Sequence, residues 1–159
     1  MKTSSIRSAA LIVVVAVVCM NIFSSCLKDK DKTTKNYTIT GNADGSQVVP
    51  ATLSGASGTI TGTYNSETRV LTFTSTWSGL SAIPTSAGFY RGPVGTAGIA
   101  TGATWNLGSG AGNSGSYTAT VTLSSIEGVE LINGGLSYSY ITPGFPNGEI
   151  RGQITATAQ

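Results

Sequence analysis

The segment RVLTFTSTWSGL, residues 69–80, carries the alternation that decides the class of fold. Its apolar positions are Leu71, Phe73 and Trp77, and the threonines opposite them are Thr72, Thr74 and Thr76. A period of two residues is typical of a β-strand that buries one side and exposes the other to water. Threonine and aromatic residues also favour strands over helices. The segment therefore predicts an antiparallel sheet with one wet face.

Segments of the same kind recur from Tyr37 onward, separated by clusters of Gly, Asn and Ser. They begin with Tyr37 and Ile39 and continue at 58–65, 98–107, 116–123, 135–142 and 148–158. In 98–107 the residues expected to face the core are Ile99, Ala103, Trp105 and Leu107. Stretches 65–69 and 108–115 are predicted loops, and 125–134 has the spacing of a short helical turn. About eight strands in roughly 120 residues predict an all-β domain, an antiparallel β-sandwich or Greek-key barrel.

The amino terminus has the pattern of an export signal. Lys2 and Arg7 precede an apolar run at 9–20, which is shorter than the roughly 20 residues that a membrane-spanning helix needs. The sequence FSSC that follows, residues 23–26, resembles the lipobox of bacterial lipoproteins. That resemblance implies cleavage before Cys26 and acylation of this cysteine, with palmitate among the chains; the alternative is an ordinary signal peptide cut nearby.

Charged side chains alternate in residues 27–36, which predicts a flexible, solvated tether. The expected organisation is a signal peptide at 1–25, a lipidated cysteine with its tether at 26–36, and one β domain at 37–159. From Cys26 onward, seven basic residues face seven acidic ones. A neutral chain lacks the basic patch that nucleic acid binding requires, so we expect no nucleic acid partner.

The chain contains no histidine, and neither of its two cysteines lies in the predicted domain. Zinc, copper and non-haem iron sites normally draw on these ligands, and Ser-His-Asp and Cys-His nucleophiles need a histidine base. Asn42 and Asp44 faintly resemble a calcium loop, but the further carboxylates of such a loop are missing. The sequence therefore predicts no metal, no cofactor and no catalytic residues.

Carboxylate chemistry is the remaining enzymatic alternative. Glu127 and Glu130, three positions apart, form a candidate pair for a glycan hydrolase, although such a pair is more often the solvated side of a turn. Glu149 and Arg151 stand behind the turn-forming run 143–148, and we expect them to share one strand face with Gln153 while Ile150 and Ile154 face the core. Polar contacts across strands, or to a loop, are the favoured role of Glu149 and Arg151.

Aromatic side chains offer a second kind of site, because they stack on sugars in many binding modules. Trp77 and Trp105 lie on the apolar phase of their strands, which favours the core. Tyr90 and Arg91 lie beside a predicted loop and are candidate binding residues together with Glu149 and Arg151.

Three segments, in order, resemble the CHRD domain, the module named from chordin and found in many bacterial secreted proteins. They are GSQVVPA (45–51), AGFYRGPVGTAG (87–98) and GLSYSYITPGFPNGEIRGQI (135–154), of which the last is the most specific. The resemblance spans residues 37–157 and implies an immunoglobulin-like β-barrel similar to that of copper-zinc superoxide dismutases. It implies no dismutase activity. The resemblance places the family's three histidine positions on Gly88, Tyr90 and Ile141, so a site that these histidines form in other members could not be formed here with the same ligands.

The sequence thus predicts a cell-envelope lipoprotein that displays a non-enzymatic CHRD-type binding or structural module. The alternatives are a carbohydrate- or peptide-binding surface protein that uses exposed aromatics and, less favoured, a carboxylate-based glycan hydrolase. The expected partners are the membrane, through the lipid on Cys26, and an envelope protein or glycan; we expect a monomer. Leu27 replaces the aspartate that retains some lipoproteins at the inner membrane, which favours the outer membrane.

Overall fold

The computed structural model describes residues 35–107 and 111–159. The predicted signal peptide, Cys26 and nearly all of the tether lie outside these residues. Within them, no helix has the length and apolar character that crossing a bilayer requires.

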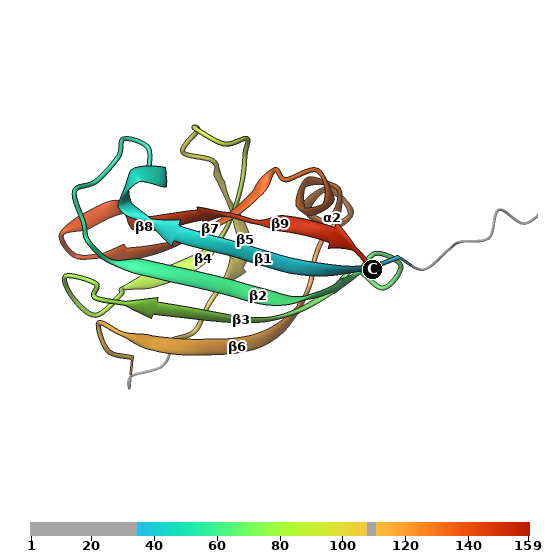
Figure 1. The fold of residues 1–159 in the computed structure, drawn as a ribbon, viewed down its shortest axis with the longest axis horizontal. Coiled ribbons are helices and arrows are strands. Elements are labelled where there is room, and N and C mark those ends of the chain that lie inside the picture. The colour runs from blue at the N-terminus through green and yellow to red at the C-terminus, as the bar shows by residue number, and fades with distance from the viewer. Residues whose placement is uncertain (1–34, 108–110) are drawn as a thin grey trace, which may run out of the picture. The chain divides into compact units, whose positions relative to one another are not determined.

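Nine antiparallel strands and two short helices make up the described residues. The strands are β1 (Asn36–Asp44), β2 (Ser57–Asn65), β3 (Val70–Ser78), β4 (Ser86–Arg91), β5 (Ile99–Thr104), β6 (Gly115–Thr122), β7 (Leu136–Thr142), β8 (Phe145–Gln153) and β9 (Thr155–Ala158). The helices are the 3-10 turn η2 (Gly45–Gln47) and α2 (Ser125–Ile132). Eight strands follow the order β5-β4-β7-β8-β1-β2-β3-β6, and β9 pairs with β1. The predicted all-β fold is confirmed as a nearly closed barrel, flattened into two layers (Figure 1).

The last strand segment joins the two layers. β8 pairs with β7, and after Ile154 the chain continues as β9 along β1, with Tyr37 opposite Ala158. At this crossover the backbones approach so closely that a Cβ on Gly41 would lie 2.7 Å from the Gln153 carbonyl oxygen, and one on Gly152 would lie 2.6 Å from that of Asn42. Glycine at both positions is therefore a condition for the crossover.

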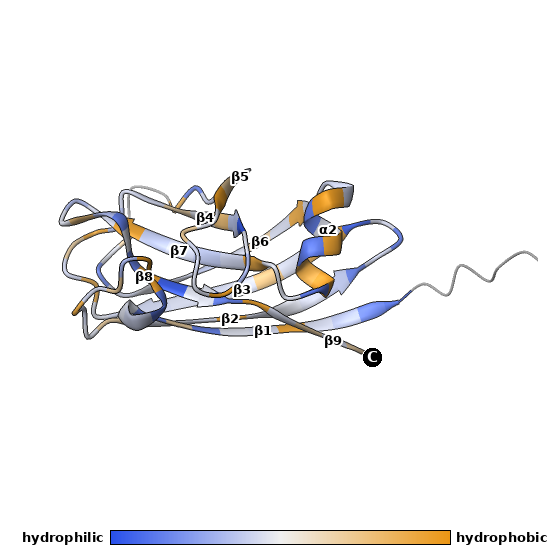
Figure 2. Ribbon diagram, turned by 90° about the horizontal axis from the view of Figure 1, so that it is seen from above, coloured by the Kyte–Doolittle hydropathy of each residue, from blue (hydrophilic) through white to orange (hydrophobic). Residues whose placement is uncertain are grey.

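The barrel is closed by side chains between its two end strands, β5 and β6. Trp105, which directly follows β5, stacks on Tyr117 of β6 with ring centroids 5.7 Å apart and planes 13° apart. Its other neighbours include Tyr138 of β7, at 6.0 Å and 19°. The Trp105 side chain thus fills the space between the two layers. Figure 2 shows these layers edge-on.

The core contains most of the residues that the alternation predicts. Tyr37, Ile39, Ile60, Tyr64, Leu71, Phe73, Trp77, Trp105, Leu123, Leu136, Tyr138, Tyr140, Ile150 and Ile154 are all buried. The prediction for Ile99 is wrong, since its side chain is 68% exposed. Ile99 begins an end strand and pairs with Arg91, the last residue of β4, so it lies beyond the residues that fill the core.

Two local predictions can be compared with the structure. The helical turn at 125–134 is confirmed as α2, whose capping box joins Ser124 and Glu127. The turn predicted at 143–148 is wrong in length, because Thr142 already pairs with Phe145 and β8 starts there. The intervening Pro143 and Gly144 suffice for a two-residue hairpin.

Candidate functional site

The segment NGEIRGQ places a row of polar side chains on the outer side of β8. Ile150 and Ile154 face the core as predicted, while Glu149, Arg151 and Gln153 point the other way. The register aligns Arg151 with Ser139 of β7 and Gly88 of β4, and Gln153 with Ser137 and Tyr90. We call this group the signature face: Gly88, Tyr90, Ser137, Ser139, Ile141, Glu149, Arg151 and Gln153. Gly88, Tyr90 and Ile141, the three positions at which the resemblance implies histidines in the family, therefore lie on the face that carries Glu149 and Arg151.

Glu149 is buried on this face, with 1% of its surface exposed. Its Oε1 accepts hydrogen bonds from Ser54 Oγ (2.8 Å) and Ser81 N (2.8 Å). Its Oε2 accepts them from Ser81 Oγ (2.7 Å) and Thr142 Oγ1 (2.6 Å). The Glu149 carbonyl oxygen accepts a fifth, from Thr52 Oγ1. One carboxylate thus fastens two loops and the end of β7 to β8.

The pKa of the Glu149 carboxyl reflects two opposing effects. Burial raises this pKa, but the hydrogen bonds from Thr142, Ser81 and Ser54 favour the charged form, and the pKa lies below its usual value. Glu149 is therefore a carboxylate at neutral pH, with each oxygen already accepting two bonds.

Arg151 contacts different segments. Its Nη1 donates to the Gln47 carbonyl oxygen (3.3 Å) and its Nη2 to Gln153 Oε1 (3.0 Å). Gln153 Nε2 in turn donates to the carbonyl oxygens of Gly134 (2.6 Å) and Gly92 (3.3 Å). Arg151 is 3% exposed, and burial lowers the pKa of its guanidinium. Arg151 and Gln153 thus hold η2 and the loops after β4 and α2 onto the face.

The other predicted contact residues lie at the rim of this face or inside the core. Tyr90 is half-buried, burial raises the pKa of its phenol, and its carbonyl oxygen accepts a hydrogen bond from Ser137 Oγ. Arg91, the next residue, points to the other side of β4 and is also half-buried. Trp77 and Trp105 are only 4% and 5% exposed, which confirms their predicted place in the core. The structure thus offers no tryptophan platform among its described residues.

The remaining carboxylate candidates have local structural roles. Asp44 caps η2, accepting from the backbone N–H groups of Ser46 (2.8 Å) and Gln47 (3.2 Å). Glu127 Oε2 accepts from Ser124 N (2.8 Å) in the capping box of α2. In the described part of the chain, no three His, Cys, Asp or Glu residues gather as metal ligands. Asp44 and Glu127 thus each cap the start of a helix, and Glu127 is engaged in the capping box rather than in a pair with Glu130.

A second surface lies on the outer side of β9, β1, β2, β3 and β6. The sequence predicts it only as a sheet face exposed to water. Strand register arranges it in three rows, which we call the threonine face. The rows are Thr157-Thr38-Thr63-Thr72-Thr120, Thr155-Thr40-Thr61-Thr74-Thr118 and Asn42-Thr59-Thr76-Ser116. The alternating threonines were visible in each segment, but the register that aligns them between strands was not.

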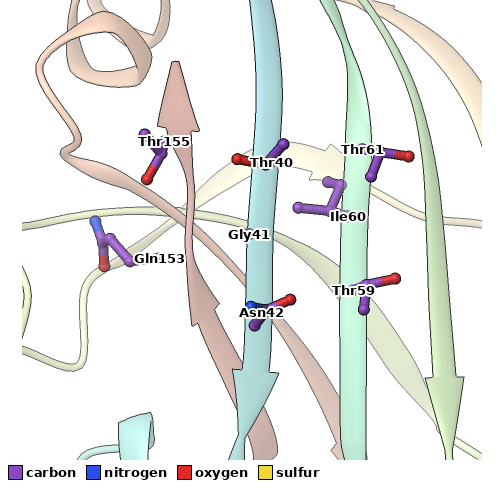
Figure 3. A pocket seen from close by; sticks show the side chains of 8 residues that line it. All are labelled: Thr40, Gly41, Asn42, Thr59, Ile60, Thr61, Gln153 and Thr155. Carbon is purple, nitrogen blue, oxygen red and sulfur yellow. The ribbon is translucent and has the colours of Figure 1, made fainter. Parts of the chain in front are cut away.

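Two shallow depressions of about 410 Å³ each lie side by side on the threonine face. Figure 3 shows the first, lined by threonines of β9, β1 and β2 together with Asn42. The second lies one row further along and shares Asn42 and Thr59 with the first. The second depression lies at the edge of the threonine face, where Asp44, Ser57 and Ser78 also line it.

Comparison with known proteins gives one match. The family model described as the CHRD domain matches residues 39–154, which run from within β1 to the crossover after β8. No curated protein and no solved structure matches the chain significantly.

Proposed function

Because the chain belongs to the CHRD domain family, we propose that it is a cell-envelope lipoprotein whose CHRD domain acts as a non-enzymatic binding or structural module. The module would be held at the membrane by lipid on Cys26 and spaced from it by the tether at 27–36. The outer membrane is the proposed location, on the evidence of Leu27 after the cysteine.

The observation that carries the non-enzymatic part of the proposal is the use of Glu149. A general acid or base needs a free site on its carboxyl for the proton that it transfers. Both oxygens of Glu149 instead accept two hydrogen bonds each from the domain itself. The most specific segment of the family pattern therefore builds the domain, and exposed surfaces are left for recognition.

The histidine positions of the family support the same conclusion. Gly88, Tyr90 and Ile141 replace them on the signature face. None of these side chains is an ordinary ligand for zinc, copper or iron, apart from the rarer use of a tyrosinate. Burial raises the pKa of Tyr90 and thus opposes the tyrosinate form. We therefore assign this face a role in fastening loops.

Changing Cys26 to alanine is expected to abolish lipid attachment, because the thiol is the acylated group. The measurement is incorporation of radiolabelled palmitate in cells that produce the wild-type chain or the Cys26→Ala variant. Cys19→Ala is the matched control, since Cys19 lies inside the apolar run and should leave with the signal peptide. Unchanged labelling of the Cys26→Ala protein would overturn the anchor.

The binding role is tested separately. Membranes that carry the full chain are solubilised in detergent, and the protein is used to capture partners from envelope extract and to probe a glycan array. Specific capture that survives in the Cys26→Ala variant would place recognition in the domain. Turnover of any glycan on the array would contradict the non-enzymatic assignment and would favour the alternative of a carboxylate-based glycan hydrolase.

A further inference from the structure

The threonine face contains more threonine than the formation of strands alone requires. Threonine has a high β propensity, so single threonines on a wet strand face need no further explanation. Exposed sheet faces are, however, normally kept soluble by charged side chains. The three rows contain no Asp, Glu, Lys or Arg, and every member is threonine except Asn42 and Ser116. The result is an array of repeating hydroxyl and methyl groups, up to five strands wide, that contains no charge within its rows and is bordered at one end by Asp44.

The repeat has two dimensions that follow from sheet geometry. Side chains on one face of an antiparallel strand recur every ~6.8 Å, and neighbouring strands lie ~4.8 Å apart. Strand register places threonines of neighbouring strands directly opposite one another, so both spacings occur across the rows. The face therefore presents an approximately rectangular array of hydroxyl groups.

Several hydroxyl groups are already held in place. Thr59 and Thr76 are joined by a hydrogen bond of 2.7 Å, Thr74 and Thr118 by one of 2.9 Å, and Thr72 and Thr120 by one of 3.0 Å. Threonine is also stiff at χ1 because it branches at Cβ. Binding to such a face costs little side-chain entropy, which favours a ligand that is itself a rigid lattice.

These features together select the chemistry of the ligand. An anionic polymer or membrane would need basic side chains, and a sugar platform that works by ring stacking would need exposed aromatic rings; the three rows contain neither. The prism surface of hexagonal ice is a rectangular lattice of oxygen atoms, with one repeat similar to the strand spacing and one slightly longer than the two-residue repeat. We propose that the threonine face binds ice, with hydroxyl groups bonded to lattice water and methyl groups seated between the water molecules.

The twist of the sheet decides which residues matter most. Neighbouring strands are rotated by roughly 20–25° on average, so the edges of a wide face turn away from any flat surface. The centre of the face, at Thr61 of β2 and Thr74 of β3, makes the closest contact with a flat crystal. Thr157 and Thr120, at opposite edges, contribute less.

The test is partition of the purified full chain into slowly growing ice, with a non-binding protein of similar size as reference. Wild-type protein is expected to be enriched in the ice and to slow ice recrystallisation. Thr61→Tyr and Thr74→Tyr should abolish the enrichment, because a large ring on the face blocks the lattice. Thr104→Tyr is the matched control: Thr104 is exposed on β5, in the other layer, and this variant should partition like wild type.

A conservative variant guards against loss of fold. Thr74→Val keeps the shape and the methyl group, and is expected to keep the wild-type thermal unfolding curve with reduced enrichment in ice. Exclusion of wild-type protein from ice to the same degree as the reference would overturn the proposal. So would equal enrichment of the Thr61→Tyr and Thr104→Tyr variants, or association of the face with a second copy of the chain in solution without enrichment in ice. Neither readout depends on Cys26, so the anchor and the ice-binding face stand or fall separately.

Discussion

Replacing Trp105 with alanine is expected to lower the free energy of unfolding by about 3–5 kcal/mol, the usual range for truncating a buried aromatic side chain. Trp105 fills the gap between the end strands β5 and β6, stacked on Tyr117 and in contact with Phe73, Phe89, Tyr138 and Tyr140. Alanine would leave a cavity and remove the side-chain closure of the barrel. Urea denaturation followed by the fluorescence of Trp77 measures the change.

Two variants make this prediction specific. Trp105→Phe should cost only about 1–2 kcal/mol, because a stacked ring remains and the indole Nε1, which is buried without a hydrogen-bond partner, is removed. Ile99→Ala, at the exposed start of the strand that precedes Trp105, should change stability by no more than about 0.5 kcal/mol. Equal effects of Trp105→Ala and Ile99→Ala would contradict closure by Trp105.

The second large effect is expected at Glu149. Glu149→Ala leaves the Ser81 N–H and the hydroxyl groups of Ser54, Ser81 and Thr142 without their acceptor, and should cost about 3–5 kcal/mol, comparable to breaking a buried ion pair. Glu149→Gln should cost less, because one oxygen remains and hydroxyl groups can rotate to accept from the new amide. Glu127→Gln is the matched control, since glutamine also completes a capping box. Denaturation midpoints and slopes give the free energies, and a Glu149→Ala effect no larger than that of Glu127→Gln would remove the fastening role.

The same carboxylate makes stability depend on pH. The pKa of Glu149 is lower in the folded state than the ordinary value of 4.5, so its contribution is complete above that value and is lost as the pH falls through the folded pKa. Asp44 acts in the same direction, because hydrogen bonds from Ser46 and Gln47 lower its pKa. Wild-type protein should therefore lose stability below about pH 4.5, whereas Glu149→Gln retains only the Asp44 part of this loss. Identical acid slopes for both proteins would contradict the assignment.

The sequence predicted the fold well wherever a strand buries one face and exposes the other. The alternation at Leu71, Phe73 and Trp77 gave the correct inward side of β3, and Ile150 and Ile154 gave that of β8. The prediction from alternation failed at Ile99. The alternation of apolar and polar residues continues to this position, but the second layer does not extend far enough to cover it. Alternation reports which side of a strand is apolar and contains no information on where the covering layer ends.

The candidate site was predicted only in part. The sequence predicts Glu149, Arg151 and Gln153 on one face. Their burial does not follow from the sequence, because the covering residues Ser54, Ser81 and Gln47 lie in two loops and in η2, all distant in sequence. The rows of the threonine face, on the other layer, could not be predicted from the sequence for a related reason. Each strand displays its threonines in the sequence, yet their alignment depends on the register between strands, which the folded backbone sets.

The pairing of β9 with β1 also orders the events of folding. Tyr37 lies opposite Ala158, and Gln159 Nε2 donates a hydrogen bond to Thr38 Oγ1 across 121 positions of sequence. On one side β1 gains its partner β2 early in synthesis. On the other side it pairs with β8 at Asp44 and with β9 from Tyr37 to Thr40, and β9 is complete only once residues 155–158 have been made. Contacts between such distant parts of a chain close slowly, because the loop entropy is lost before the contacts form. The edge of β1 that faces β9 therefore stays open in the nascent chain until the last strand has been made.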